Sequence, residues 1–291
     1  MEKNVSWVLA IVGVMIVIGL GIREWGRNQL VGHANYRFNL AVIKPSQGVS
    51  FVSFDPVEKQ IITIPFPTEL AITTRSNGEY GISSLYKLGS YNGNGGGMFA
   101  RQKIQGFMRV PVPGYVVSER PLSRELFLSI FRKGESNLSR FDAGLLFARS
   151  LRYRGRVIDE KELFRAGVIE DNKYKAKRLQ EYIGSRLFDW GIGAESVSVA
   201  IVNASGENGL GSDLAEFLSN LGLDVVMVRS VESDHQLEES SWQVSSSLEA
   251  EKLNYIFQNL FQLDTPKIEA IPAEYRANVL VMVGKDAKEL F

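Results

Sequence analysis

The chain has 291 residues, of which 45% are apolar and 23% charged, with 33 basic and 33 acidic side chains. This composition is typical of a folded protein, and the lack of a basic excess argues against a nucleic-acid binder. There is no cysteine, which excludes disulfides, thiolate nucleophiles and thiolate metal sites. Neither of the two histidines, His33 and His235, lies in a triad or zinc motif, so we expect no metal and no cofactor.

An uncharged apolar run begins at Val5 and ends at Ile22. As a helix it reaches about 27 Å, close to the hydrocarbon thickness of a bilayer. Trp7 and Trp25 lie near its ends, where indole rings favour the interface. We expect a retained signal anchor in the cytoplasmic membrane, crossing once, with the rest of the chain outside. A cleaved signal peptide is the alternative.

The first domain is expected over residues 36–156, after a tail, membrane helix and stalk over residues 1–35. Its predicted strands are residues 38–43, 49–54, 59–64 and 70–73, with a turn at Asp55-Pro56. The glycine-rich residues 91–97 predict a flexible loop, because no lysine-serine or lysine-threonine pair follows to complete a phosphate cradle. A helix is predicted over residues 98–108.

Four arginines follow a predicted helix over residues 141–148, at positions 149, 152, 154 and 156. Guanidinium groups suit bidentate contact with phosphate. The alternative is a solvated helix end, where cations are favoured by the helix dipole.

A charged, helix-prone connector is predicted over residues 157–195. Its basic residues, among them Lys175 and Arg178, indicate a solvated helix face, with contact to anionic lipid as the alternative.

The second domain is expected over residues 196–291. Its predicted strands are residues 197–202, 224–228 and 278–283, its helices residues 212–221 and 248–261, and residues 230–247 are predicted to form a polar loop. This alternation indicates a small parallel or mixed sheet with covering helices, so we expect α/β folds in both domains. The turn at residues 203–212 lacks the spacing of a dinucleotide site and the Walker A lysine. It therefore indicates a tight turn in which Ser212 or a neighbour caps the helix.

The second domain resembles the LytR C-terminal domain, an accessory module of LytR-CpsA-Psr cell-envelope proteins. The residues that carry the resemblance are V-A-I-V-N-A-S-G at 199–206, G-L at 209–210, L-x-x-L-G-L-D-V at 218–225 and V-L-V-M-V-G-K-D at 279–286. The resemblance implies a bacterial protein of the cell envelope.

The first domain is similar to the LytR-CpsA-Psr catalytic domain. The matching segments are F-V-S-F-D-P at 51–56, I-I-T-I-P at 61–65, I-S-S-L-Y-K-L-G at 82–89 and L-F-A-R-S-L-R-Y at 146–153. The family carries an arginine-aspartate pair where this chain has Phe66-Pro67, and an aspartate-threonine where it has Gly48-Val49. Only Arg149 and Arg152 match the family's phosphate-binding positions, which implies a degenerate relative.

These observations predict a membrane-anchored extracytoplasmic envelope protein that binds or scaffolds and has no catalytic residues. Its expected partners are the lipid bilayer and a wall polymer, a polyprenyl-linked precursor or other envelope proteins, but no nucleic acid. One alternative is an active phosphotransferase that attaches polyprenyl-pyrophosphate-linked glycan to the cell wall. The other is a bitopic structural subunit of a pilus or secretion assembly. The oligomeric state stays open.

Overall fold

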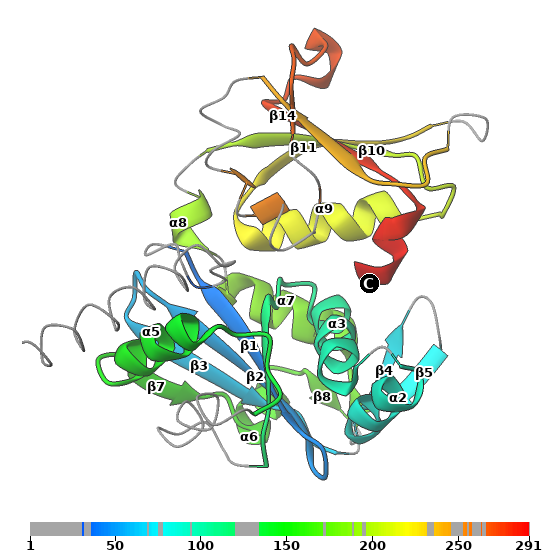
Figure 1. Ribbon diagram of the computed structural model, residues 1–291. Helices are drawn as coiled ribbons and strands as arrows, with labels where there is room; N and C mark the ends of the chain where they lie inside the picture. The colour runs from blue at the N-terminus through cyan, green and yellow to red at the C-terminus, as the bar shows by residue number, and fades with distance from the viewer. Residues whose placement is uncertain are drawn as a thin grey trace, which may run out of the picture.

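The structure, a computed structural model, describes residues 31, 36–68, 70–74, 78–93, 95–119, 134–170, 173–187, 189–193, 196–231, 236–245, 253–254, 256–257, 263 and 266–290. They form two α/β lobes, each built on a five-stranded sheet (Figure 1). The predicted α/β class is confirmed. The predicted membrane helix and both histidines lie outside the described residues, among which no helix is long and apolar enough to cross a bilayer.

The first sheet has the strand order β6-β1-β2-β3-β7. Its strands are β1 (Phe38–Lys44), β2 (Gly48–Asp55), β3 (Gln60–Pro65), β6 (Gly114–Val117) and β7 (Arg154–Val157). The first three form an antiparallel meander, while β6 runs parallel to β1 and β7 parallel to β3. The three strands predicted here are confirmed to within two residues at each end.

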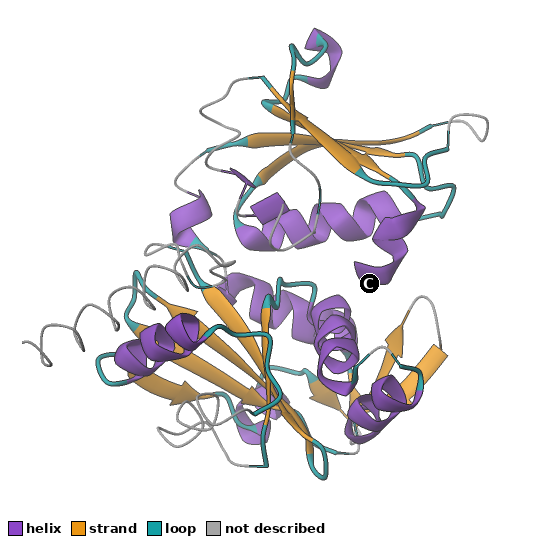
Figure 2. Cartoon of the chain, in the orientation of Figure 1, coloured by secondary structure: helices purple, strands orange, loops and turns teal. Residues whose placement is uncertain are grey.

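Helices cover both faces of this sheet, as Figure 2 shows. Leu40 and Val42 pack in one cluster with α5 (Arg140–Ser150), whereas Ala41 and Ile43 pack in another with α3 (Gly96–Met108) and α7 (Ala176–Leu187). A strand covered on both faces has no solvent-facing side, which explains why β1 is apolar at successive positions.

The remaining elements of this lobe surround the sheet. They are the hairpin β4 (Ala71–Thr74) and β5 (Gly78–Gly81), η1 (Ile82–Ser84), α2 (Leu85–Tyr91), α6 (Glu160–Arg165), and the hairpin β8 (Ile169–Glu170) and β9 (Lys173–Tyr174). Helix α8 (Trp190–Gly193) lies between the lobes (Figure 1), and its Ile192 packs in the core of the second. The helix-prone connector is therefore interrupted by a hairpin. Its apolar side chains Leu179, Ile183 and Leu187 join the core beneath α3. How the chain divides into domains stays a prediction.

The second sheet has the order β11-β10-β14-β12-β13. Its strands are β10 (Ser198–Asn203), β11 (Asp224–Ser230), β12 (Ser241–Val244), β13 (Lys267–Ile268) and β14 (Val279–Val283). Strands β11 and β14 are parallel to β10, and β12 is antiparallel to β14, so the sheet is mixed as predicted. Helix α9 (Leu210–Leu221) buries the predicted stripe and ends at Gly222, at φ 101°. Two short helices, η4 (Ala273–Tyr275) and η5 (Lys285–Leu290), flank β14.

The predicted polar loop over residues 230–247 is wrong in part, because β12 lies within it. Trp242 on this strand is fully buried, and its ring stacks on Phe257 at 4.5 Å between centroids. Most of the helix predicted over residues 248–261 lies outside the described residues, although Leu253, Ile256 and Phe257 are described and buried.

Candidate anion-binding site at the end of helix α5

Helix α5 is fixed at its first turn by two polar residues. The Ser139 hydroxyl accepts a hydrogen bond from the Asp142 N–H at 3.0 Å, and the Asp142 carboxylate accepts one from the Ser139 N–H at 3.1 Å. This reciprocal capping box satisfies two donors that the helix start would otherwise leave free. The other oxygen of the buried Asp142 carboxylate accepts the N–H of Val31 at 3.0 Å. Residues far apart in sequence therefore position α5.

Arg149 occupies a core-facing position of this helix. The buried positions of α5 are Asp142, Ala143, Leu146 and Arg149, which is the spacing of one helical face. Arg149 is only 8% exposed, and its Nη1 has no hydrogen-bond partner among the described residues. Burying a guanidinium donor without an acceptor disfavours folding. A bound anion would supply the missing acceptor.

The four arginines of the sequence cluster do not form one site. Arg152 is exposed in the turn after α5, and its N–H donates to the Arg149 carbonyl at 3.0 Å. Arg154 lies exposed on the edge strand β7, and Arg156 pairs with Glu162 at 2.7 Å. Arg149 and Arg152 thus remain adjacent at one helix end. Within the described part of the chain, no carboxylate pairs with either of them.

The positions that correspond to the family's arginine-aspartate and aspartate-threonine pairs carry no charge here. Phe66 is buried, and its ring meets that of Phe107 edge-on at 6.0 Å. Val49 is also buried, and a Cβ on Gly48 would lie 3.4 Å from Ile82. Among the described residues, no group of three histidine and acidic side chains could hold a metal ion.

These apolar positions also lie far from Arg149. Strand β3 starts at Gln60, opposite Arg154, and Phe66 follows its last residue. A strand rises about 3.3 Å per residue, so the two ends are about 20 Å apart. The fold therefore does not bring the Phe66 position next to the end of α5.

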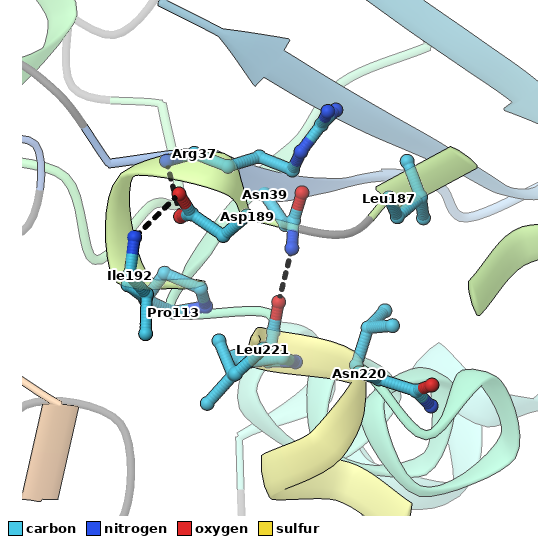
Figure 3. A pocket seen from close by; sticks show the side chains of 10 residues that line it. Arg37, Asn39, Pro113, Leu187, Asp189, Ile192, Asn220 and Leu221 are labelled. Carbon is cyan, nitrogen blue, oxygen red and sulfur yellow. Dashed lines mark hydrogen bonds between the residues drawn. The ribbon is translucent and has the colours of Figure 1, made fainter. Parts of the chain in front are cut away.

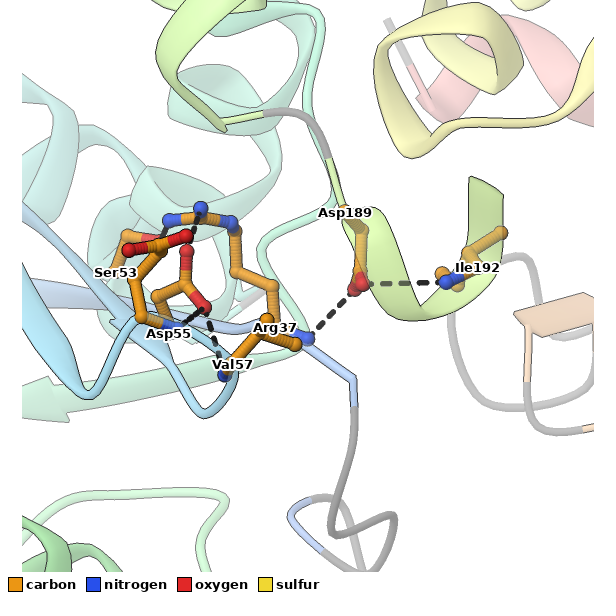
Figure 4. A network of polar contacts seen from close by, with 7 residues as sticks. Arg37, Ser53, Asp55, Val57, Asp189 and Ile192 are labelled. Carbon is orange, nitrogen blue, oxygen red and sulfur yellow. Dashed lines mark hydrogen bonds and ion pairs between the residues drawn. The ribbon is translucent and has the colours of Figure 1, made fainter. Parts of the chain in front are cut away.

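Sequence reasoning missed a polar network at the start of β1 (Figure 4). Arg37 pairs with Asp55, donates from Nη1 to the Ser53 hydroxyl at 3.0 Å, and donates its backbone N–H to Asp189 at 2.6 Å. Burial lowers the pKa of Arg37 below its usual value, and the charges of Asp55 and Asp189 act against this shift. No sequence pattern links these positions, because Arg37 and Asp189 are 152 residues apart.

A pocket beside this network lies at the junction of the two lobes (Figure 3). Asn39 donates to the Pro111 carbonyl there at 2.7 Å, and Asp189 accepts the N–H of Ile192 at 3.3 Å. The cavity measures only about 10 Å³, which is room for about one water molecule. This small cavity is part of the packing between the lobes and is too small to hold a ligand.

The glycine-rich turn of the second lobe satisfies its own polar groups. Asn203 accepts from the Ser205 hydroxyl at 2.6 Å and donates to the Glu207 carbonyl at 2.9 Å. A Cβ on Gly206 would lie 2.5 Å from Gln236. The predicted tight turn is confirmed, but α9 starts after Gly209, without a side-chain cap from Ser212.

Lys175, Lys177 and Arg178 of the connector are solvent-exposed, as the predicted solvated face requires. Lys175 pairs with Glu170, and Arg178 lies exposed on α7. Together with the exposed Phe164 they line an open groove of about 530 Å³.

Comparison with known proteins gives no match to a family model and none to a curated protein. Among solved structures, the transcriptional regulator yvhJ from Bacillus subtilis is 11% identical over 53% of this chain and 97% of its own, with a TM-score of 0.37. A transcriptional regulator from Enterococcus faecalis is 9% identical over 79% of this chain and 97% of its own, with a TM-score of 0.36.

The LytR-CPS2A-psr family protein YwtF (TagT) of B. subtilis, solved with a bound octaprenyl pyrophosphate lipid, is 12% identical over 78% of this chain and 92% of its own, with a TM-score of 0.26. Structural neighbours therefore include members of this family. At such identities and scores, they do not assign the present chain to it.

Proposed function

We propose that this chain is a membrane-anchored, extracytoplasmic envelope protein that binds an anionic envelope ligand through Arg149 without converting it. The observation that carries the proposal is the buried guanidinium of Arg149, whose Nη1 has no acceptor among the described residues. Such a group is ready to donate to a phosphoryl oxygen. The ligand class is the pyrophosphate of a polyprenyl-linked precursor or the phosphate of a wall polymer.

A further observation supports binding without turnover. Phosphoryl transfer needs several cations or a metal to stabilise charge as it develops. Phe66 stands where the resembling family carries an arginine, and it is instead buried in the apolar core. Gly48 stands where the family carries an aspartate, so this chain has no carboxylate at that position either. The apolar run from Val5 to Ile22 and the resemblance of the second domain support the membrane and envelope placement.

The test measures binding and turnover of a polyprenyl pyrophosphate by the full-length chain in lipid nanodiscs. We expect saturable binding, no release of phosphate, and an affinity at least tenfold weaker in Arg149→Met, which corresponds to about 1.4 kcal/mol. Arg178→Met, at an exposed arginine of α7, is the matched control and should bind normally. Turnover that Arg149→Met abolishes would instead establish the phosphotransferase, and absence of binding would refute the proposal.

The same variant separates ligand binding from a structural role. Methionine keeps most of the length of the Arg149 side chain but removes the unpaired buried donor. We expect the free energy of unfolding without ligand to rise by about 1 kcal/mol, measured by chemical denaturation. A fall in stability would show that the guanidinium serves folding.

A further inference from the structure

Two turns lie side by side at one end of the first sheet. Strands β3 and β7 run parallel with Gln60 opposite Arg154, and the Arg154 N–H donates to the Lys59 carbonyl at 2.9 Å. This pairing brings the β2–β3 turn next to the turn between α5 and β7 (Figure 1). We call this surface the sheet tip. It consists of Val57, Glu58, Lys59, Leu151, Arg152 and Arg154.

The sheet tip combines exposed apolar side chains with basic side chains. Val57 and Leu151 are 52% and 50% exposed. Lys59, Arg152 and Arg154 outnumber the single carboxylate of Glu58, and none of the three has an ion-pair partner among the described residues. Apolar groups surrounded by cations match a lipid interface that carries anionic headgroups.

Hydrogen bonds order the backbone of the β2–β3 turn, which exposes the side chain of Val57. The buried carboxylate of Asp55 accepts the N–H groups of Val57 and Glu58 at 2.9 and 3.0 Å, and it also pairs with Arg37. A turn ordered in this way loses little conformational entropy when Val57 enters an interface.

The position of Val31 limits how far helix α5 can lie from the end of the apolar run. Val31 is buried, and its N–H bonds to Asp142 in the first turn of α5. The chain from Ile22, the end of the apolar run, to Val31 spans at most about 30 Å. Leu151 lies only about 14 Å beyond Asp142 along the helix axis.

We propose that the sheet tip docks on the anionic surface of the bilayer in which residues 5–22 are anchored. This inference rests on the membrane anchor of the proposed function. Docking would hold Arg149, two positions before Leu151, near the depth of lipid headgroups. A lipid-linked anion could then reach it without leaving the membrane.

The lack of cysteine allows a direct test by labelling single introduced thiols. The two variants are Leu151→Cys and Tyr91→Cys in the full-length chain. In each, the new thiol is labelled with a polarity-sensitive fluorophore, and the protein is reconstituted into vesicles. Tyr91 is 91% exposed and ends α2, on the side of the lobe away from α5 (Figure 1). In mixed phosphatidylcholine and phosphatidylglycerol vesicles, we expect the fluorescence emission of the label to shift to the blue at position 151 and not at position 91.

The docking should also depend on the charges of the lipid and of the sheet tip. The shift at position 151 should shrink in phosphatidylcholine alone, at high salt, and when Arg152→Gln and Arg154→Gln are added. The matched control adds Lys177→Gln and Arg178→Gln on α7, where both side chains are exposed, and should keep the shift.

The outcomes separate the two proposals. A chain that alkaline carbonate strips from the vesicles overturns the anchor and the docking together. A chain that stays inserted while the label at 151 reports water, or while both labels shift equally, overturns the docking alone.

Discussion

Three buried arginines of the first lobe show how differently one residue type can be accommodated. Arg37 pairs with the carboxylate of Asp55, whereas Arg101 donates from Nη1 to the Val112 carbonyl at 2.9 Å. Burial lowers the pKa of Arg101 below its usual value, and the charge of Tyr115 acts against this shift. Arg149 has no side-chain acceptor among the described residues. The three guanidinium groups therefore differ in what they contact: a carboxylate, a backbone carbonyl, and no acceptor among the described residues.

Two glycines of the first lobe differ in the space available for a side chain. A Cβ on Gly96 would lie 2.6 Å from the Tyr86 backbone oxygen, whereas one on Gly155 would meet nothing within 4 Å. We expect Gly96→Ala to lower the free energy of unfolding by about 2 kcal/mol, because α2 and α3 would have to separate. Gly155→Ala should change it little. Equal effects of the two substitutions in urea denaturation would contradict this account.

At the scale of elements, a polar contact joins helices α6 and α7. The Tyr182 hydroxyl donates to Glu162, which also pairs with Arg156 of β7. The Tyr182 hydrogen bond, aided by the charge of Arg156, lowers the pKa of Glu162 below its usual value. This contact therefore contributes stability above the usual pKa of a glutamate and loses it as pH falls through the lowered value.

Removing the hydroxyl should reverse that shift. In Tyr182→Phe, we expect the pKa of Glu162 to rise toward the usual value, as measured by NMR titration of its carboxyl carbon. Tyr91→Phe, at an exposed tyrosine, should leave it unchanged. The effect on stability should be small because solvent screens this partly exposed pair. An unchanged pKa in Tyr182→Phe would show that Arg156 and Arg186 lower it without the hydroxyl.

At the scale of the molecule, the two lobes meet through α3, α7 and α9. Arg109, at the end of α3, pairs with Asp213 at 2.9 Å, and its carbonyl accepts from Asn220 at 2.8 Å. A Cβ on Gly184 of α7 would lie 2.9 Å from Asn220, so the helices approach closely there. These contacts couple two sheets that have separate hydrophobic cores.

Removing the ion pair between Arg109 and Asp213 should weaken the contact between the two lobes. We expect Asp213→Asn to lower the free energy of unfolding by about 1–2 kcal/mol. The thermal transitions of the lobes should also move apart in calorimetry. Glu238→Gln, which removes an exposed pair with Lys285, is the control and should have little effect. A single unchanged transition in Asp213→Asn would show that apolar contacts alone hold the lobes together.

Features that depend on residues close together in the sequence could be predicted, whereas features that depend on distant residues could not. The helix stripe of Leu214, Phe217 and Leu218 repeats within a few residues, so local periodicity was enough to find it. Strand β12 was missed because it is short and lies in a polar segment. Its burial depends on pairing with β14 and on stacking between Trp242 and Phe257.

The sequence by itself determined the α/β class, the strands of the first meander, and the presence of arginines after α5, because these follow from periodicity and residue type along the chain. Only the tertiary structure decided that Arg149 faces the core while Arg152 faces solvent, and that Phe66 lies at the far end of β3. Solvent access and the meeting of distant residues depend on how the elements pack. A single sequence does not record that packing.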